Sequence, residues 1–175
     1  AQDTSELFFN DVKVPKDNLL GEAGMGFIYL MRELPQERLS IAVSAVAACE
    51  AVIQETVKYV KQRTAFGKTI ADFQYTQFKL AELEAEVTVM RVFIDRCAEL
   101  LVKKELSTVE ASKSKLLATV LQGKVTDQCV QMHGGYGYMW EYPVARAYAD
   151  ARVQRIYGGT SEVMKLIIGR DLLAD

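Results

Sequence analysis

Histidine is nearly absent from this chain, and its shortage excludes two kinds of catalytic centre. His133 is the only histidine among 175 residues. A carboxylate-bridged metal site in a helical bundle uses Glu-x-x-His motifs from two helices, so a single histidine excludes it. A Ser–His or Cys–His nucleophile pair would have to use this same residue, which directly precedes a glycine turn. We therefore interpret His133 as a structural histidine or one at the edge of a ligand, and we predict no metal site.

Cysteine, net charge and long apolar runs are also limited. Cys49, Cys97 and Cys129 are odd in number and lie far apart in apolar surroundings, which predicts buried free thiols and a reducing compartment. A net charge of −2 with interspersed signs predicts no nucleic-acid partner. No apolar run approaches the length of a bilayer-spanning helix, and the start of the chain lacks a targeting leader. We therefore predict no membrane span.

Only three prolines and few strand-like segments interrupt the chain, and helical periodicity fills most of it. The exception is SELFFNDVKVP, residues 5–15, which is rich in Phe and Val and predicts a strand that stops at the proline. Asp72 is expected to cap the second helix, and STVE at residues 107–110 has the form of a capping box for the third. The first three predicted helices cover residues 36–62, residues 73–104, and residue 107 to the HGGYGY turn. The fourth predicted helix covers residues 143–156 and continues after Gly158 and Gly159. The prediction is an all-α fold, an antiparallel four-helix bundle with a broken last helix, preceded by one short strand.

Three glycine-containing segments lie at the predicted helix ends: RTAFGKTIADFQ, QMHGGYGY and RIYGGTSEV. Arg63 is placed to reach a phosphate, and Gly134 and Gly135 leave room for one beside the backbone. Two adjacent glycines, Gly158 and Gly159, precede a helix start, where N–H groups attract negative charge. No G-x-G-x-x-G motif follows a strand, so the segments predict a ligand site without a Rossmann fold.

Several motifs, taken together in their order, are similar to those of the acyl-CoA dehydrogenase family. They are VPKDNLLGEAGMGF, RTAFGKTIADFQ, QMHGGYGYMWEYPVARAYADARVQRIYGGTSEV and IIGRDLL, and they cover almost the whole chain. The chain resembles the C-terminal helical domain of the family, which follows an N-terminal helical domain and a middle β-domain. The resemblance implies that residues 1–20 end the middle β-domain and form a linker, and that residues 21–175 are the four-helix bundle. It also implies that the chain is a fragment of a longer protein.

The resemblance further implies that the cofactor is FAD. Arg63 matches the residue that meets the pyrophosphate, in a part of FAD that crosses to a neighbouring subunit. Thr160 lies at the helix start that meets the flavin nucleotide of the same subunit. The residues that match FAD-contacting positions are Arg63, Phe66, Gln131, Gly134, Gly135, Thr160 and Glu162.

The same resemblance implies which residue is the catalytic base. Many family members carry a glutamate at the position of Gly158, and a glycine cannot remove a proton. In the long-chain and isovaleryl-CoA branches the glutamate comes instead from an E-R-L motif, here Glu37, Arg38 and Leu39. We therefore predict that Glu37 takes the α-proton of a thioester in a water-poor pocket, and that Arg38 orients or tunes its carboxylate. The backbone N–H of Gly158 would bind the developing enolate oxygen.

The implied activity is α,β-desaturation of an acyl-CoA thioester in fatty acid β-oxidation. The run MWEYPVARAYADARVQ is most like the long-chain branch, which favours a long- or medium-chain substrate. The alternatives are a branched-chain enzyme of the isovaleryl or citronellyl type, an acyl-CoA oxidase, and a non-catalytic helical oligomerisation module. The family implies an electron-transfer flavoprotein as partner, a homodimer or homotetramer, and a cytoplasmic location in a bacterium or the mitochondrial matrix in a eukaryote. The isolated chain is expected to be inactive.

Overall fold

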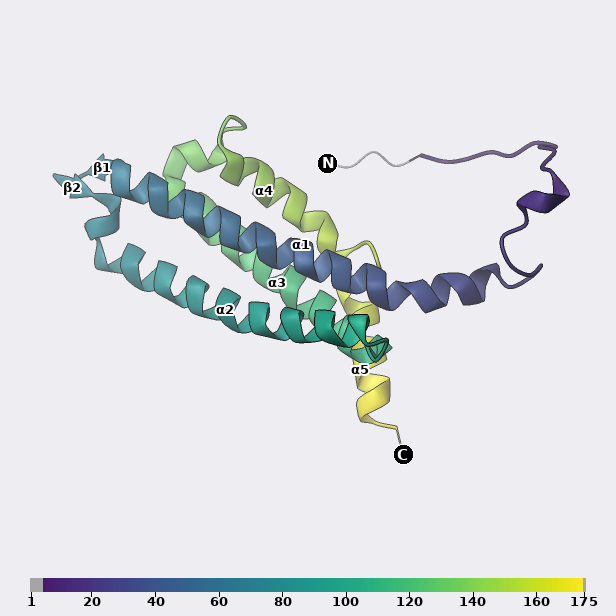
Figure 1. Cartoon of the computed structure of the whole chain (residues 1–175). Helices are drawn as coiled ribbons and strands as arrows, with labels where there is room; N and C mark the ends of the chain where they lie inside the picture. The colour runs from purple at the N-terminus through teal and green to yellow at the C-terminus, as the bar shows by residue number, and fades with distance from the viewer. Residues whose placement is uncertain (1–4, 175) are drawn as a thin grey trace.

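Helices dominate the architecture of the computed structural model, which describes residues 5–174 (Figure 1). The structure has three long helices, α1 (Gly26–Gln62), α2 (Gln74–Val102) and α3 (Thr108–His133); α2 runs antiparallel to α1 and α3, which point in the same direction. The shorter α4 (Pro143–Ala151) and α5 (Ser161–Leu172) both pack on α3, which therefore occupies the centre of the bundle. Short 3-10 helices cover Lys16–Asn18, Ile70–Asp72, Gly134–Tyr138 and Arg152–Arg155. The predicted all-α bundle is confirmed.

The first long helix begins ten residues earlier than the pattern predicted. It starts at Gly26 and contains Pro35, although the sequence indicated a start near Gln36. Proline removes one backbone donor from a helix interior, but the preceding residues include Leu, Met, Arg and Glu, which are good helix formers. Their helical preference carries α1 beyond the bundle, where Phe27 and Leu30 are exposed.

The predicted strand at residues 5–15 does not form in this chain. Ser5–Pro15 is extended without a ladder partner, and its apolar side chains point into solvent, with Phe8 79% exposed. A strand needs a neighbour for its N–H and C=O groups, and the described residues offer none there. Residues 1–4 of the expected β-domain end lie outside the described residues. Its assignment to a β-domain stays a prediction.

A hairpin that the sequence did not predict connects α1 to α2. Strand β1 (Thr64–Ala65) pairs with β2 (Lys68–Thr69) in antiparallel register, Thr64 opposite Thr69 and Ala65 opposite Lys68. Its two-residue turn places Phe66 at φ 52° and Gly67 at φ 80°. Both values are positive, as the mirror-image turn of a tight hairpin requires. Two-residue strands leave too short a pattern for sequence reasoning to detect.

One predicted helix cap is confirmed and another is wrong. The Ser107 hydroxyl accepts from the N–H of Glu110 at 3.0 Å, and the Glu110 carboxylate accepts from the N–H of Ser107 at 3.3 Å. Asp72 does not cap α2. Instead it forms a capping box with Thr69 on the preceding 3-10 turn, because the hairpin inserts that turn ahead of α2.

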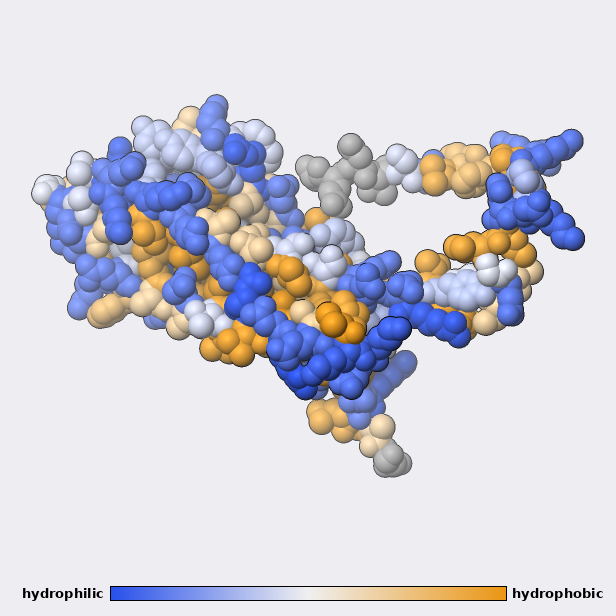
Figure 2. Space-filling view, in the orientation of Figure 1, coloured by the Kyte–Doolittle hydropathy of each residue, from blue (hydrophilic) through white to orange (hydrophobic). Residues whose placement is uncertain are grey.

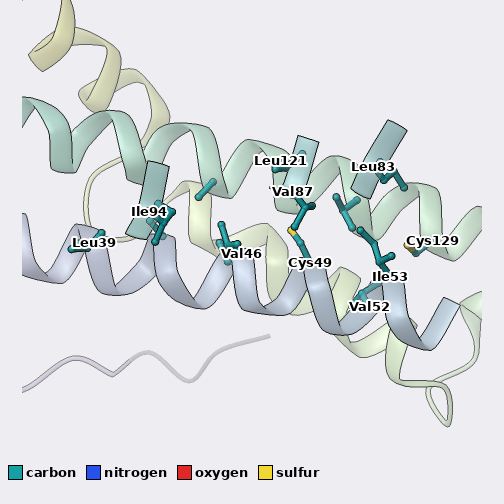
Figure 3. Packing of buried hydrophobic residues seen from close by; sticks show 14 of the residues in the cluster. Leu39, Val46, Cys49, Val52, Ile53, Leu83, Val87, Ile94, Leu121 and Cys129 are labelled. Atoms are coloured by element: carbon teal, nitrogen blue, oxygen red, sulfur yellow. The ribbon is translucent and has the colours of Figure 1, made fainter. Parts of the chain in front are cut away.

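The hydrophobic core lies between α1, α2 and α3, whose side chains point toward one another in Figure 3. It includes Val46, Leu83 and Ile94, all essentially inaccessible to solvent. The three cysteines are free and buried, as predicted. Burial raises the pKa of Cys49 to about 12, which keeps this thiol protonated and unreactive.

Helix α3 buries a polar stripe that sequence periodicity did not reveal. Its members recur every three or four residues, namely Ser112, Lys115, Thr119, Gln122 and Thr126, and all are buried. In contrast the apolar Leu117 of the same helix is 48% exposed. The hydroxyls avoid the cost of burial because each donates to a carbonyl four residues back, as Thr119 does to Lys115 at 2.9 Å.

Exposed apolar side chains lie on the surface between α2 and α3, beside the ion pair of Lys124 and Glu86. Figure 2 shows hydrophobic side chains on the flank of the bundle and on the N-terminal arm. A cavity of about 470 Å³ lies between α2 and α3 and is lined by Val89, Leu117 and Val120, among others. We call these side chains the α2–α3 groove.

Among residues 5–174, α1 is the one helix long and apolar enough to cross a membrane, with a mean hydropathy of 1.4 over 18 residues. The expectation that no stretch reaches such a length is wrong by this measure. The apolar residues of α1 form the bundle core, and the core helix of a soluble protein passes the same test. The predicted absence of a membrane span stays a prediction.

Candidate functional site

A cavity opens at the end of the bundle where α1 and α3 both terminate. Its volume is about 920 Å³, and the hairpin and the turn after α3 form its walls. Five predicted cofactor-binding residues line it, although they come from two segments far apart in sequence. They are Arg63, Phe66, Gln131, Gly134 and Gly135.

Arg63 and Phe66 enter this cavity from the α1 side. The backbone N–H of Arg63 closes α1 on the carbonyl of Tyr59 at 2.9 Å, and its guanidinium carbon lies 5.5 Å from the ring centre of Tyr136. Arg63 forms no ion pair with another described residue, so its charge is available to an anion. Phe66 is 95% exposed at the hairpin tip in a left-handed conformation that is costly for a bulky residue. An exposed, strained aromatic side chain is typical of a contact with a ligand or partner.

Gly134 and Gly135 form the opposite wall. Gly134 has φ 59°, which only glycine adopts readily, and ends α3. A Cβ atom added at either glycine would have no neighbour within 4 Å. The open space beside the backbone is therefore available to a group outside the chain.

Behind this wall lies an aromatic stack that sequence reasoning missed. The ring of His133 stacks on that of Tyr59 with centres 4.2 Å apart, and the Tyr59 hydroxyl donates to the His133 carbonyl at 3.1 Å. His133 Nδ1 lies 2.8 Å from the Cys129 carbonyl, which can only accept, so Nδ1 carries the proton in the neutral ring. Burial lowers the pKa of His133. His133 also lines the cavity, and its assignment as a structural histidine or one at the edge of a ligand stays a prediction.

The remaining predicted residues gather at the glycine loop between α4 and α5. Arg38 is 5% exposed, and its Nε donates to the Gly158 carbonyl at 3.3 Å, while Nη1 donates to the Ser112 hydroxyl at 3.4 Å. Burial lowers the pKa of Arg38, and the charge of Glu37 opposes that effect. A buried arginine thus joins the E-R-L motif to the glycine loop.

The missing side chain at position 158 would point at the same helix. A Cβ atom added to Gly158 would lie 2.6 Å from Cδ1 of Ile41. Ile41 follows Glu37 by four residues, so the two lie on the same face of α1 one turn apart. A side chain at position 158 would therefore point toward α1 about one turn from Glu37. Glu37 itself is exposed, and the described residues alone do not form the expected water-poor pocket around it.

Thr160 and Glu162 open α5 directly after the loop. The N–H of Val163 donates to the Thr160 hydroxyl at 3.3 Å, which makes Thr160 the N-cap. The pKa of Glu162 is lowered by its own backbone N–H and by the Thr160 hydroxyl, so this carboxylate is charged at the helix start.

The predicted site residues thus form two groups. Arg63 caps the C-terminal end of α1 and follows Glu37 by 26 residues, which corresponds to about 39 Å along a straight helix. The two groups therefore cannot hold the same end of one ligand. The cavity group is made of an exposed cation, an exposed aromatic ring and side-chain-free backbone, a set that suits a dinucleotide with an anionic diphosphate.

The fold is a helical bundle domain with a cavity at one end that suits a nucleotide ligand. A family model described as the acyl-CoA dehydrogenase C-terminal domain matches residues 24–173. The chain belongs to this family.

Relatives and solved structures agree with this assignment. The chain is 57% identical over 175 residues to the mitochondrial long-chain specific acyl-CoA dehydrogenase of Rattus norvegicus, covering all of this chain and 41% of that protein. It matches an acyl-CoA dehydrogenase structure from Geobacillus kaustophilus with a TM-score of 0.91 at 49% identity, over 95% of this chain and 44% of the other. An acyl-CoA dehydrogenase from Bacillus anthracis in complex with FAD matches with a TM-score of 0.85 at 32% identity, over 91% of this chain and 31% of the other. The chain therefore spans less than half the length of these relatives.

Proposed function

We propose that this chain is the C-terminal helical part of an FAD-dependent acyl-CoA dehydrogenase that forms an α,β double bond in a long- or medium-chain acyl-CoA. The observations that carry the proposal are the contacts between the Gly158 loop and the turn of α1 that holds Glu37. Arg38 ties the loop to α1, and the added Cβ at position 158 meets Ile41 one turn from Glu37. A carboxylate on α1 would therefore reach the place that a side chain on the loop would otherwise occupy.

Glu37 would remove the α-proton of the bound thioester. Bound FAD would accept the β-hydrogen together with its electron pair. Arg38 is held by the Gly158 carbonyl and the Ser112 hydroxyl, so its charge lies at a fixed place beside the base. The exposed state of Glu37 in this chain implies that another part of the full-length protein covers it and excludes water. This fits relatives more than twice as long as the chain.

The cofactor would be held at two places. Arg63, Phe66, Gln131, Gly134 and Gly135 would bind the adenine-diphosphate part through the cavity. Thr160 and Glu162 at the start of α5 would meet the flavin nucleotide. Because the two groups lie far apart along α1, they would serve two FAD molecules in a homodimer or homotetramer.

The partner and the cellular location follow from the same proposal. Reduced FAD would pass its electrons to an electron-transfer flavoprotein. Relatives of this chain include mitochondrial enzymes, which supports the matrix as the location in a eukaryote and the cytoplasm in a bacterium.

The test is dye-linked dehydrogenation by the full-length parent protein on straight long-chain, medium-chain and isovaleryl-type CoA esters. Glu37→Gln should lower turnover roughly 10²–10⁴-fold while FAD stays bound, because it removes the proton acceptor and little else. Glu55→Gln is the matched control, since Glu55 is an exposed glutamate on the same helix that pairs only with Lys58. Full turnover in Glu37→Gln would refute the assignment of the base, and an inactive parent would favour the non-catalytic module.

A further inference from the structure

Lys115 is the largest fully buried side chain of the described residues. It lies on the polar stripe of α3, is 0% exposed, and its ammonium Nζ donates to the Gly159 carbonyl at 2.6 Å. Its neighbour Arg38 donates to the carbonyl of the preceding residue, Gly158. Two buried cations thus hold two successive carbonyls of one short loop.

Neither cation has a carboxylate partner among the described residues. Burying a charge without an opposite charge is costly, and a well-packed apolar side chain is often as stable or more stable there. Burial and the charge of Arg38 lower the pKa of Lys115, and Glu162 opposes this only in part. Stability therefore gives no reason for a lysine at this position.

The geometry of the peptide bond shows what the two cations achieve. The described residues contain no cis peptide bond, and in a trans peptide the C=O and N–H groups point in opposite directions. Holding the carbonyls of Gly158 and Gly159 inward therefore turns the N–H groups of Gly159 and Thr160 outward. Neither N–H donates to another group of the described residues. A cation on the oxygen of a peptide also polarises its N–H and makes it a stronger donor.

We propose that Lys115 is a positioning residue that acts with Arg38 to aim and polarise the loop N–H groups toward the reaction cleft. The inference rests on the proposed function, in which the loop at Gly158 borders the thioester and α5 begins beside the flavin. Preorganised donors at Gly159 and Thr160 would add to the N–H of Gly158 in stabilising the negative charge that develops as the α-proton leaves.

The experiment compares full-length holoenzymes carrying Lys115→Met and Lys113→Met with the wild type. Methionine matches lysine in length and lacks the charge, and Lys113 is an exposed lysine on the same helix, so it controls for the substitution itself. Three quantities are measured: flavin reduction by acyl-CoA in single turnover, the melting temperature, and hydrogen–deuterium exchange of the peptide spanning residues 153–164.

For Lys115→Met we expect the melting temperature to be unchanged or higher, and exchange in the loop peptide to be faster. Flavin reduction at saturating substrate should slow by about 10- to 100-fold, which is less than the loss of a donor itself because the donors remain but lose their fixed direction. The substrate dissociation constant should change little, since the effect arises in the transition state. Lys113→Met should match the wild type in all three measurements.

If Lys115→Met exchanges loop hydrogens and reduces flavin at the same rates as the wild type, the inference is overturned and the proposed function stays intact. A lower melting temperature with normal reduction by the folded fraction would show a purely structural role and also overturn it. Lys115→Gln serves as a second variant, and failure of both to fold with FAD would likewise count against a positioning role. If the wild type itself is not reduced by any acyl-CoA, the proposed function fails and the inference fails with it.

Discussion

Moving the base from α1 to the glycine loop should restore part of the activity that Glu37→Gln removes. In the double variant Glu37→Gln/Gly158→Glu, the new carboxylate starts from a backbone atom that faces the same space as Glu37. The added Cβ points at Ile41, one turn from the original base. If the two positions border one thioester, either carboxylate can take its α-proton.

The structure sets the penalty for this move. Gly158 has φ 63°, and a non-glycine residue there costs about 1–2 kcal/mol. The new Cβ lies 2.6 Å from Cδ1 of Ile41, which must leave its rotamer at a cost of about 0.5–1.5 kcal/mol. If about 2 kcal/mol of this strain adds to the activation free energy, turnover of the double variant should be roughly 30-fold below that of the wild type. The single variant Glu37→Gln should fall roughly 10²–10⁴-fold, so a partial rescue is measurable.

The assay is dye-linked turnover of the full-length protein with the best acyl-CoA substrate, accompanied by thermal melting. The matched control is Glu37→Gln/Gly158→Gln, which carries the same backbone and steric strain without a base. Both double variants should melt at the same lowered temperature, and only the one with the carboxylate should recover turnover. Equal turnover in the two double variants would refute the shared space.

Two further predictions concern protonation and assembly. The pKa of His133 is lowered in the folded chain, so the unfolded chain binds more protons at about pH 6. The free energy of unfolding should therefore fall as the pH drops from about 6.5 through the folded pKa. His133→Phe keeps a ring against Tyr59 and should remove this pH dependence from urea denaturation measured between about pH 7 and 5, and an unchanged pH dependence would contradict a buried neutral histidine. The isolated chain should retain little or no FAD. It should also self-associate through the α2–α3 groove and the exposed N-terminal arm, residues 5–15. A yellow, monomeric species in gel filtration would contradict both expectations.

Sequence reasoning predicted the helices well where apolar periodicity and capping agreed. The capping box of Ser107 and Glu110 fixed the start of α3 correctly, and the glycine turn at Gly134 fixed its end. The start of α1 was missed because Pro35 reads as a boundary, whereas the structure tolerates one lost hydrogen bond in a helix of 37 residues. The strand predicted at residues 5–15 does not form for a different reason, because a strand needs a partner for its backbone hydrogen bonds and the described residues offer none there.

The candidate site was predictable only through the resemblance. Composition and spacing indicated a phosphate-binding place at Arg63, Gly134 and Gly135, and the cavity brings those residues together. They gave no indication that Arg38 is buried, since an arginine beside a glutamate at a helix start usually lies in solvent. Lys115 was missed because it lies among hydrophilic residues in the run ASKSK, which reads as a solvated helix face.

The polar stripe of α3 also limits how this helix can be misaligned. A purely apolar stripe could slide by a heptad or rotate slightly and still bury similar surface. Here a shift of α3 would separate the ammonium of Lys115 from the Gly159 carbonyl and leave a charge in the interior with no acceptor. Lys115 thus raises the energy of alternative registers of α3 more than it lowers the energy of the native register. The unpaired charge in every other register restricts α3 to a single alignment.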